Sequence, residues 1–127
     1  MWVVSWSYPY ATQDGTCTTG PVKVRVRITF TLPKWNVPSD ASQALIDRWA
    51  AYMTALQTHE DGHKEIGIQA GHDILRTLEG LPSYPTCDEL EEAADAAGER
   101  VLDRYREQEI IYDQTTRHGA TQGARFP

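Results

Sequence analysis

The chain lacks the long apolar runs, the basic excess and the cysteine clusters that each mark a common class of protein. No stretch of the sequence approaches the roughly 18 consecutive apolar residues that a membrane-spanning helix needs. The residues after Met1 lack the basic segment and the apolar segment that a signal peptide has. Acidic residues outnumber basic ones by 18 to 12, and the net charge of −6 disfavours binding to a phosphate backbone. At 127 residues, 40% of them hydrophobic, we expect a single domain, residues 1–127, without a membrane span or a nucleic-acid partner.

The two cysteines, Cys17 and Cys87, have neither the CxxC nor the Cys/His spacing of a zinc knuckle or a redox motif, which disfavours a cysteine-based redox protein. A disulfide between them would close a loop of about 70 residues and stabilise the fold by roughly 4 kcal/mol. Two unpaired buried thiols are the alternative. Because disulfides persist in oxidising compartments, the bridge predicts a secreted or periplasmic protein.

Two stretches alternate between apolar and polar residues with the period of a half-buried strand. The alternation runs through residues 2–10 and is complete from Val22 to Leu32. The turn-rich residues 13–21 between the two stretches predict a connecting loop, so that residues 1–35 form an antiparallel hairpin. An isolated hairpin is marginally stable in water, and its apolar face therefore requires a cover.

A long helix over residues 39–80 is predicted to provide part of that cover. Asp40 can cap it, and the apolar residues that follow recur at helical spacing up to Gly80. A rod of this length is expected to bend or break, most readily at Gly62, Gly67 or Gly71.

A second helix is predicted over residues 86–113, because Thr86 and Glu89 form a capping box ahead of an apolar stripe. The short connection makes the two helices antiparallel neighbours, and residues 114–127 have the composition of an irregular tail. The predicted fold class is α+β, with an antiparallel β-hairpin packed on a long antiparallel helical hairpin.

His59, Glu60 and His63 form the pattern HExxH, the half-site of zincin metallopeptidases, on the first predicted helix. Residues four apart lie one turn above each other, so both imidazoles can bind one zinc ion about 2 Å away. Glu60 borders the same face, where its carboxylate can take a proton from a water that zinc activates. Both histidines fall on the stripe that faces the core, where unpaired imidazoles are costly. Satisfied core histidines, or a solvated face at a helix bend, are the alternative.

A third protein ligand has to come from further along the chain. The extended pattern HExxHxxGxxH is absent, since Ile66 and Gln69 occupy the positions that require Gly and His. His118, in the polar tail, is the first candidate and Asp113 is the second. In a straight hairpin that turns at Ser83, Asp113 lies about 9 Å from level with the histidines and His118 lies about 15 to 23 Å away. His118 can therefore bind only if the second helix ends near Asp113 and the chain folds back.

Several segments along nearly the whole chain together carry a resemblance to a known family. They are residues 2–6, Leu32-Pro33-Lys34-Trp35, Thr58 to His63, the single cysteine before the second helix, and the ending Tyr112-Asp113, Thr116, His118-Gly119, Gln122-Gly123-Ala124 and Phe126-Pro127. They resemble a bacterial domain-of-unknown-function family described as predicted secreted zinc-dependent proteases. The resemblance implies zinc, export and peptidase-like chemistry, and it implies no particular substrate.

These observations predict a zinc-dependent metallopeptidase that hydrolyses a peptide or amide bond in a peptide or protein substrate. His59, His63 and His118 would bind Zn²⁺, with Asp113 as the alternative third ligand, and Glu60 would be the general base. Tyr112 is a candidate oxyanion donor, with packing in the core as its alternative. The alternative function is a non-catalytic, exported interaction module with a structural or vestigial zinc site. An open coordination position favours the enzyme, and a closed site with four ligands favours the module.

Overall fold

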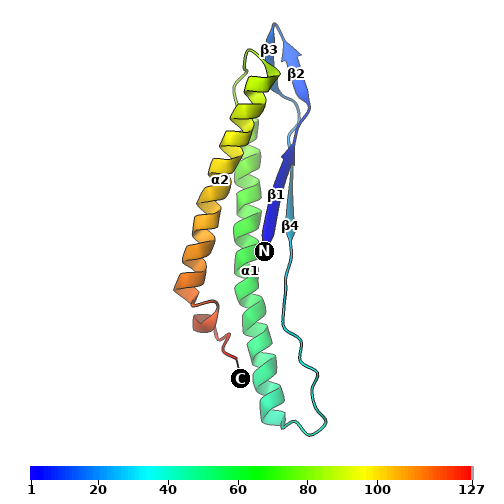
Figure 1. Cartoon of the computed structure of the whole chain (residues 1–127), viewed down its shortest axis with the longest axis vertical. Helices are drawn as coiled ribbons and strands as arrows, with labels where there is room; N and C mark the ends of the chain where they lie inside the picture. Colours follow the sequence, from blue (N-terminus) through cyan, green and yellow to red (C-terminus); the bar gives the residue numbers. More distant parts are fainter. Residues whose placement is uncertain (127) are drawn as a thin grey trace.

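Two long antiparallel helices form the axis of the molecule, and four short strands lie along one side of it (Figure 1). The computed structural model describes residues 1–126. Its elements are β1 (Trp2–Ser7), β2 (Tyr10–Gln13), β3 (Thr16–Thr19), β4 (Lys23–Ile28), α1 (Gln43–Glu79), α2 (Cys87–Thr116) and the short 3₁₀ helix η1 (Ala120–Gln122). The α+β class predicted from the sequence is confirmed. Within residues 1–126, no helix is both long enough and apolar enough to span a membrane.

The strands form two separate antiparallel pairs, where the sequence had predicted one hairpin closed by a loop. β1 pairs with β4, so that Trp2 lies opposite Ile28 and Trp6 opposite Val24. The prediction of a loop over residues 13–21 is wrong, because β2 and β3 pair with each other across this region. The turn between them is Asp14-Gly15, and both residues have positive φ. Asp-Gly favours the tight turn of a two-residue hairpin, which explains the second strand pair.

The first helix continues through all three glycines at which an interruption was expected. These glycines instead let neighbouring side chains approach the helix backbone. A Cβ atom on Gly67 would lie 2.6 Å from Cγ of Trp2, and one on Gly71 would lie 2.4 Å from Cγ2 of Val26. Both contacts are too short for real atoms, so the glycines allow the β1–β4 sheet to pack closely on α1.

The N-cap residue predicted from the sequence is confirmed for α2 and is wrong for α1. Thr86 caps α2 as predicted, since its hydroxyl accepts a hydrogen bond of 3.1 Å from the Glu89 N–H. The cap of α1 is Ser42, whose hydroxyl accepts from the Leu45 N–H at 3.2 Å, and Asp40 lies outside the helix. Serine and aspartate are equally good N-caps, so local preference alone does not choose between the two positions.

The core lies where the inner face of the β1–β4 sheet meets both helices. Trp2, Trp6, Val24 and Val26 pack against its buried residues, which are Val4, Ala70, Ile74, Leu78, Ala94, Val101, Leu102 and Tyr105. The start of α1 extends past the end of α2, beside the tail and the connection from β4 (Figure 1). The two predicted histidine ligands lie between the core and this extension.

A disulfide between Cys17 and Cys87 joins β3 to the start of α2, with the two Cα atoms 5.2 Å apart. Cys17 also exchanges two backbone hydrogen bonds, of 2.7 and 2.9 Å, with Tyr84 in the connection between the helices. The predicted bridge is thus confirmed, and it is consistent with an extracellular location.

Replacing both cysteines with serine should lower the free energy of unfolding by about 4 kcal/mol, because the bridge closes a loop of 70 residues that the unfolded chain must otherwise close itself. Urea denaturation of the wild type and the double variant measures this difference. As a control, the denatured, unreduced wild type should take up no thiol reagent. Two labelled thiols per chain would contradict the bridge.

Candidate metal site

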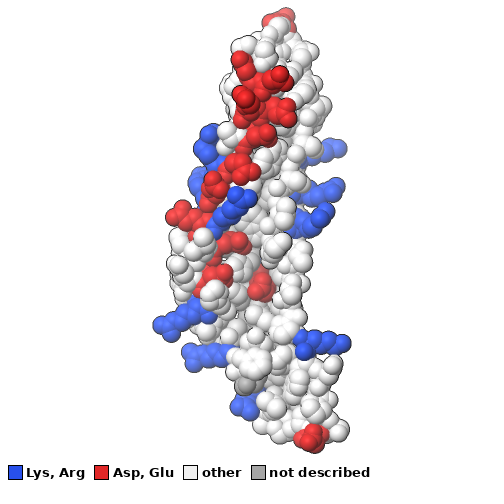
Figure 2. Space-filling model, in the orientation of Figure 1, with Lys and Arg blue, Asp and Glu red and all other residues white. Residues whose placement is uncertain are grey.

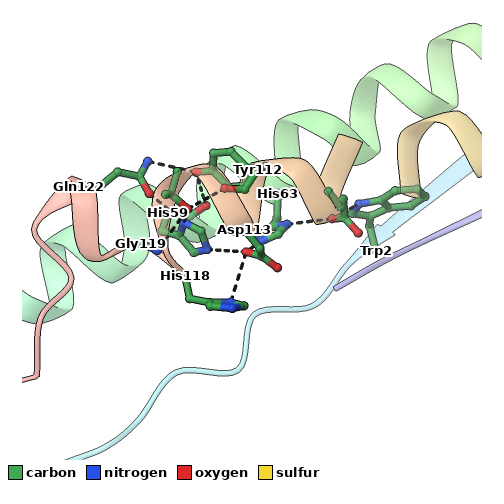
Figure 3. A network of polar contacts seen from close by, with 10 residues as sticks. Trp2, His59, His63, Tyr112, Asp113, His118, Gly119 and Gln122 are labelled. Atoms are coloured by element: carbon green, nitrogen blue, oxygen red, sulfur yellow. Dashed lines mark hydrogen bonds and ion pairs between the residues drawn. The ribbon is translucent and has the colours of Figure 1, made fainter. Parts of the chain in front are cut away.

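Two histidines from α1 and one aspartate from α2 bring three potential metal ligands together. Oδ1 of Asp113 lies 3.0 Å from Nε2 of His59 and 2.8 Å from Nε2 of His63 (Figure 3). His59 is buried, with 3% of its surface exposed, and the side chains of His63 and Asp113 are 13% and 31% exposed. The ligand atoms of these three residues all lie within 4.8 Å of one another, so the group could hold a metal ion. It is the one group of at least three His, Cys, Asp or Glu side chains found with this spacing within residues 1–126.

The second ring nitrogen of His59 is held by the tail. Its Nδ1 lies 2.8 Å from Oε1 of Gln122. The amide orientation of Gln122 is fixed because its Nε2 donates to the Tyr112 hydroxyl at 3.1 Å, which leaves Oε1 to face the histidine. An amide oxygen only accepts hydrogen bonds, so Nδ1 of His59 must carry the proton. Nε2 is then the ring nitrogen that faces Asp113.

The second ring nitrogen of His63 is held by a carboxylate. Its Nδ1 lies 2.9 Å from Oε1 of Glu109, and the indole N–H of Trp2 donates to the same oxygen. Because an ionised carboxylate only accepts, Nδ1 of His63 carries a proton, and Nε2 is the ring nitrogen that faces Asp113. Carboxylate partners of this kind fix the tautomer and orientation of metal-binding histidines.

The donor set fits a divalent metal ion. Two imidazole nitrogens converge on one carboxylate oxygen, and a cation could replace the protons that the Nε2 atoms otherwise share with Asp113. Zinc bonds of about 2.0 to 2.1 Å at tetrahedral angles separate neighbouring ligand atoms by about 3.3 Å. The observed separations of 2.8 and 3.0 Å are close to that value, so small side-chain movements would admit the ion.

Tyr112 packs directly against both histidines. Its ring stacks on His59 at 4.8 Å between centroids and meets the edge of His63 at 5.0 Å. Its hydroxyl donates to the backbone carbonyl of His59 at 2.9 Å. A Cβ atom on Gly62 would lie 2.1 Å from that hydroxyl oxygen, so the glycine inside the HExxH pattern makes room for the tyrosine.

The tail reaches His59 through a turn in which three successive residues have positive φ. The angles are 51° at Arg117, 54° at His118 and 92° at Gly119. The turn is held by the His118 N–H, which donates to the Asp113 carbonyl at 2.9 Å, and by the Gly119 N–H, which donates to the Thr116 hydroxyl at 3.3 Å. A Cβ atom on Gly119 would lie 3.0 Å from Cγ of His59, so this stretch of backbone lies directly on the imidazole.

The structure brings four of the predicted site residues into one cluster and leaves two at its margin. His59, His63, Asp113 and Tyr112 are in mutual contact. His118 is 83% exposed and lies outside the convergent group, with its Nδ1 3.8 Å from Oδ1 of Asp113 (Figure 3). Glu60 is half-buried, and its carboxylate takes part in no hydrogen bond or ion pair with the rest of residues 1–126.

Sequence reasoning missed the residues that orient the histidines, namely Glu109, Gln122 and Trp2. A signal for Glu109 was present, because Glu109 and Asp113 are four apart on α2 exactly as the two histidines are on α1. The straight-hairpin estimate instead placed Asp113 about 9 Å from level. The connection between the helices shifts them along their axes, and His63 therefore faces Glu109.

Comparison with known proteins gives one family and no activity. Residues 1–119 match a family described as "Bacterial protein of unknown function (DUF922)". No curated protein matches the chain, and no solved structure matches it.

Replacing Gln122 with alanine should weaken zinc binding by about 10 to 100-fold, because His59 loses the partner that fixes its tautomer. Competition with a chromophoric zinc chelator measures the affinity. Gln114→Ala, on the exposed side of α2, is the matched control and should leave the affinity unchanged. Equal affinities for the two variants would contradict the role of Gln122.

Proposed function

The chain belongs to the bacterial family DUF922, and from the geometry of its site we propose that it is a zinc-dependent hydrolase of peptide or amide bonds. The observation that carries the proposal is the convergence of two histidine Nε2 atoms and one carboxylate oxygen. Three protein ligands leave a coordination position for substrate, whereas structural zinc sites are closed by four. The single-domain organisation of residues 1–127 is part of the same proposal.

The proposed ligands are His59, His63 and Asp113. His118, the first candidate from the sequence, is set aside because its imidazole is 83% exposed and outside the group of convergent atoms. Two imidazoles and one carboxylate suit zinc better than magnesium or calcium, which prefer six or more oxygen ligands. His118 lies at the open side of Asp113, where it can contact a bound substrate.

The proposed reaction assigns proton transfer to Glu60. Zinc in such a site polarises a carbonyl group and lowers the pKa of water toward about 7. Glu60 follows His59 directly and has no competing partner, so its carboxylate is free to take a proton and to return it to the leaving nitrogen. Tyr112 is assigned to positioning, because its hydroxyl already donates to the His59 carbonyl.

The proposed location is outside the cytoplasm, in the periplasm or the extracellular space. Its support is the bridge between Cys17 and Cys87, which reducing compartments do not maintain. The substrate would then be a peptide or protein encountered there.

Replacing Glu60 with glutamine should abolish hydrolysis and leave zinc content unchanged, because the carboxylate moves protons and is not a ligand. Cleavage of a mixed peptide library by the zinc-loaded protein, followed by mass spectrometry, measures activity. Glu65→Gln, at an exposed position of the same helix, is the matched control and should cleave like the wild type. Undiminished cleavage by the Glu60 variant would refute the mechanism. A zinc-loaded wild type that cleaves nothing would favour the non-catalytic module.

Replacing Asp113 with alanine should lower zinc affinity by orders of magnitude, because the site loses its only carboxylate ligand. His118→Ala is the comparison, and its affinity should stay within about threefold of the wild type, since an exposed side chain contributes little to the ordered site. Chelator competition on the two variants measures both values. A larger loss of zinc affinity in His118→Ala than in Asp113→Ala would instead identify His118 as the third ligand.

A further inference from the structure

A hollow lies on α1 on the N-terminal side of the histidines. Trp35, Leu45, Trp49 and Phe126 line it, and its volume is about 240 Å³. The Trp49 ring centroid is 5.6 Å from that of Trp35 and 6.1 Å from that of Phe126, so aromatic faces and edges form most of the wall. This volume is below the range of about 300 to 1,000 Å³ typical of small-molecule sites, and it suits one large apolar side chain.

The hollow and the metal group lie along the same side of α1. Trp49 and His59 are about 15 Å apart along the helix axis, on one apolar stripe. The tail connects the two places, since Gln122 binds His59, Gly123 lies beside Ala55, and Phe126 forms a wall of the hollow. An extended peptide covers about 15 Å with four or five residues, at 3.3 to 3.6 Å each. A substrate held at the metal group can therefore place a side chain in the hollow.

The surroundings of the hollow carry a charge opposite to that of the protein as a whole. A basic residue directly precedes each of its three aromatic residues, and these are Lys34, Arg48 and Arg125. All three are exposed and form no ion pair within residues 1–126. Figure 2 shows basic side chains on both sides of this end of the molecule and an acidic group at its tip, whereas most acidic side chains gather along α2 toward the other end. An anionic group beside the bound side chain would be attracted here.

We propose that this hollow binds an apolar side chain of the substrate, four or five residues from the cleaved bond, with a carboxylate next to it. The inference rests on the proposed hydrolase function, because the metal group fixes the position of the cleaved bond. The carboxylate can be the C-terminus of the peptide or an acidic side chain. The aromatic wall selects the apolar side chain, and the basic residues favour the charge.

A series of hydroxamates tests the spacing. Each probe has the form hydroxamate-(Gly)n-Phe, with one to seven glycines and a free C-terminal carboxylate. The hydroxamate binds zinc, and the number of glycines sets the distance between the zinc and the phenylalanine. Competition binding to the zinc-loaded protein should be tightest when the spacer spans about 15 Å. The gain over the matching probe that ends in alanine should be about 10-fold, as expected for burying one aromatic side chain. Amidating the carboxylate should weaken the best probe by a few-fold.

Two variants assign the gain to the hollow. Phe126→Ala should remove the dependence on spacer length and leave the alanine probes unaffected, whereas Phe30→Ala, another exposed phenylalanine, should behave like the wild type. Hydroxamates that bind equally at every spacer length would overturn the inference and leave the metal site standing.

Failure of every hydroxamate to bind would instead contradict the metal site. Binding of an apolar side chain in the hollow would then need a separate test that does not use zinc. Acetyl-phenylalanine titrated into the metal-free protein should quench tryptophan fluorescence, and Phe126→Ala should weaken the effect. The absence of quenching would overturn the inference.

Discussion

The arrangement of the molecule around the site depends on one electrostatic constraint, the convergence of two imidazole nitrogens on one carboxylate oxygen. Such a group keeps its geometry only if each ring is held from behind by a hydrogen-bond partner. One strand, the second helix and the tail contribute to that restraint. Strand β1 brings Trp2 to Glu109, α2 brings Glu109 to His63, and the tail brings Gln122 to His59.

The glycines of α1 make this convergence possible at a cost in helix stability. A glycine inside a helix is less favourable than alanine by about 1 kcal/mol, so three of them weaken α1 noticeably. Each is offset by a close contact that no other residue would permit. Gly67 and Gly71 receive the sheet, and Gly62 receives the ring of Tyr112 that covers both histidines. The packing of the sheet and the formation of the site therefore use the same face of one helix.

The disulfide and the C-terminal tail restrain α2 at its opposite ends. The disulfide fixes β3 to the start of α2, remote from the histidines, while the tail closes over His59 at the other end of that helix (Figure 1). The tail turn uses positive φ at Arg117 and His118, a conformation that costs side-chain-bearing residues about 1 to 2 kcal/mol each. The hydrogen bonds of His118 and Gln122 offset this cost, and metal binding would add to them. Ordering of the tail and occupation of the site are therefore coupled in the proposed enzyme.

The sequence by itself determined the features that depend on local periodicity. The alternation in β1 and β4, the capping box at Thr86 and the HExxH spacing all follow from which residues share a face, because these patterns repeat within one or two turns of chain. The pairing of Cys17 with Cys87 was also accessible, since only two cysteines are present.

Only the tertiary structure decided which distant residues complete the site. The axial offset between α1 and α2 depends on the path of the connection that Cys17 and Tyr84 tie down, and no local pattern encodes that path. The offset selects Glu109 as the partner of His63 and brings Asp113 within hydrogen-bond distance of both histidines. The turn after Thr116 then brings Gln122 onto His59 and leaves His118 outward. A shift of one helical turn is about 5.4 Å, more than a hydrogen bond can span, so side-chain contact across the two helices is decided by packing alone.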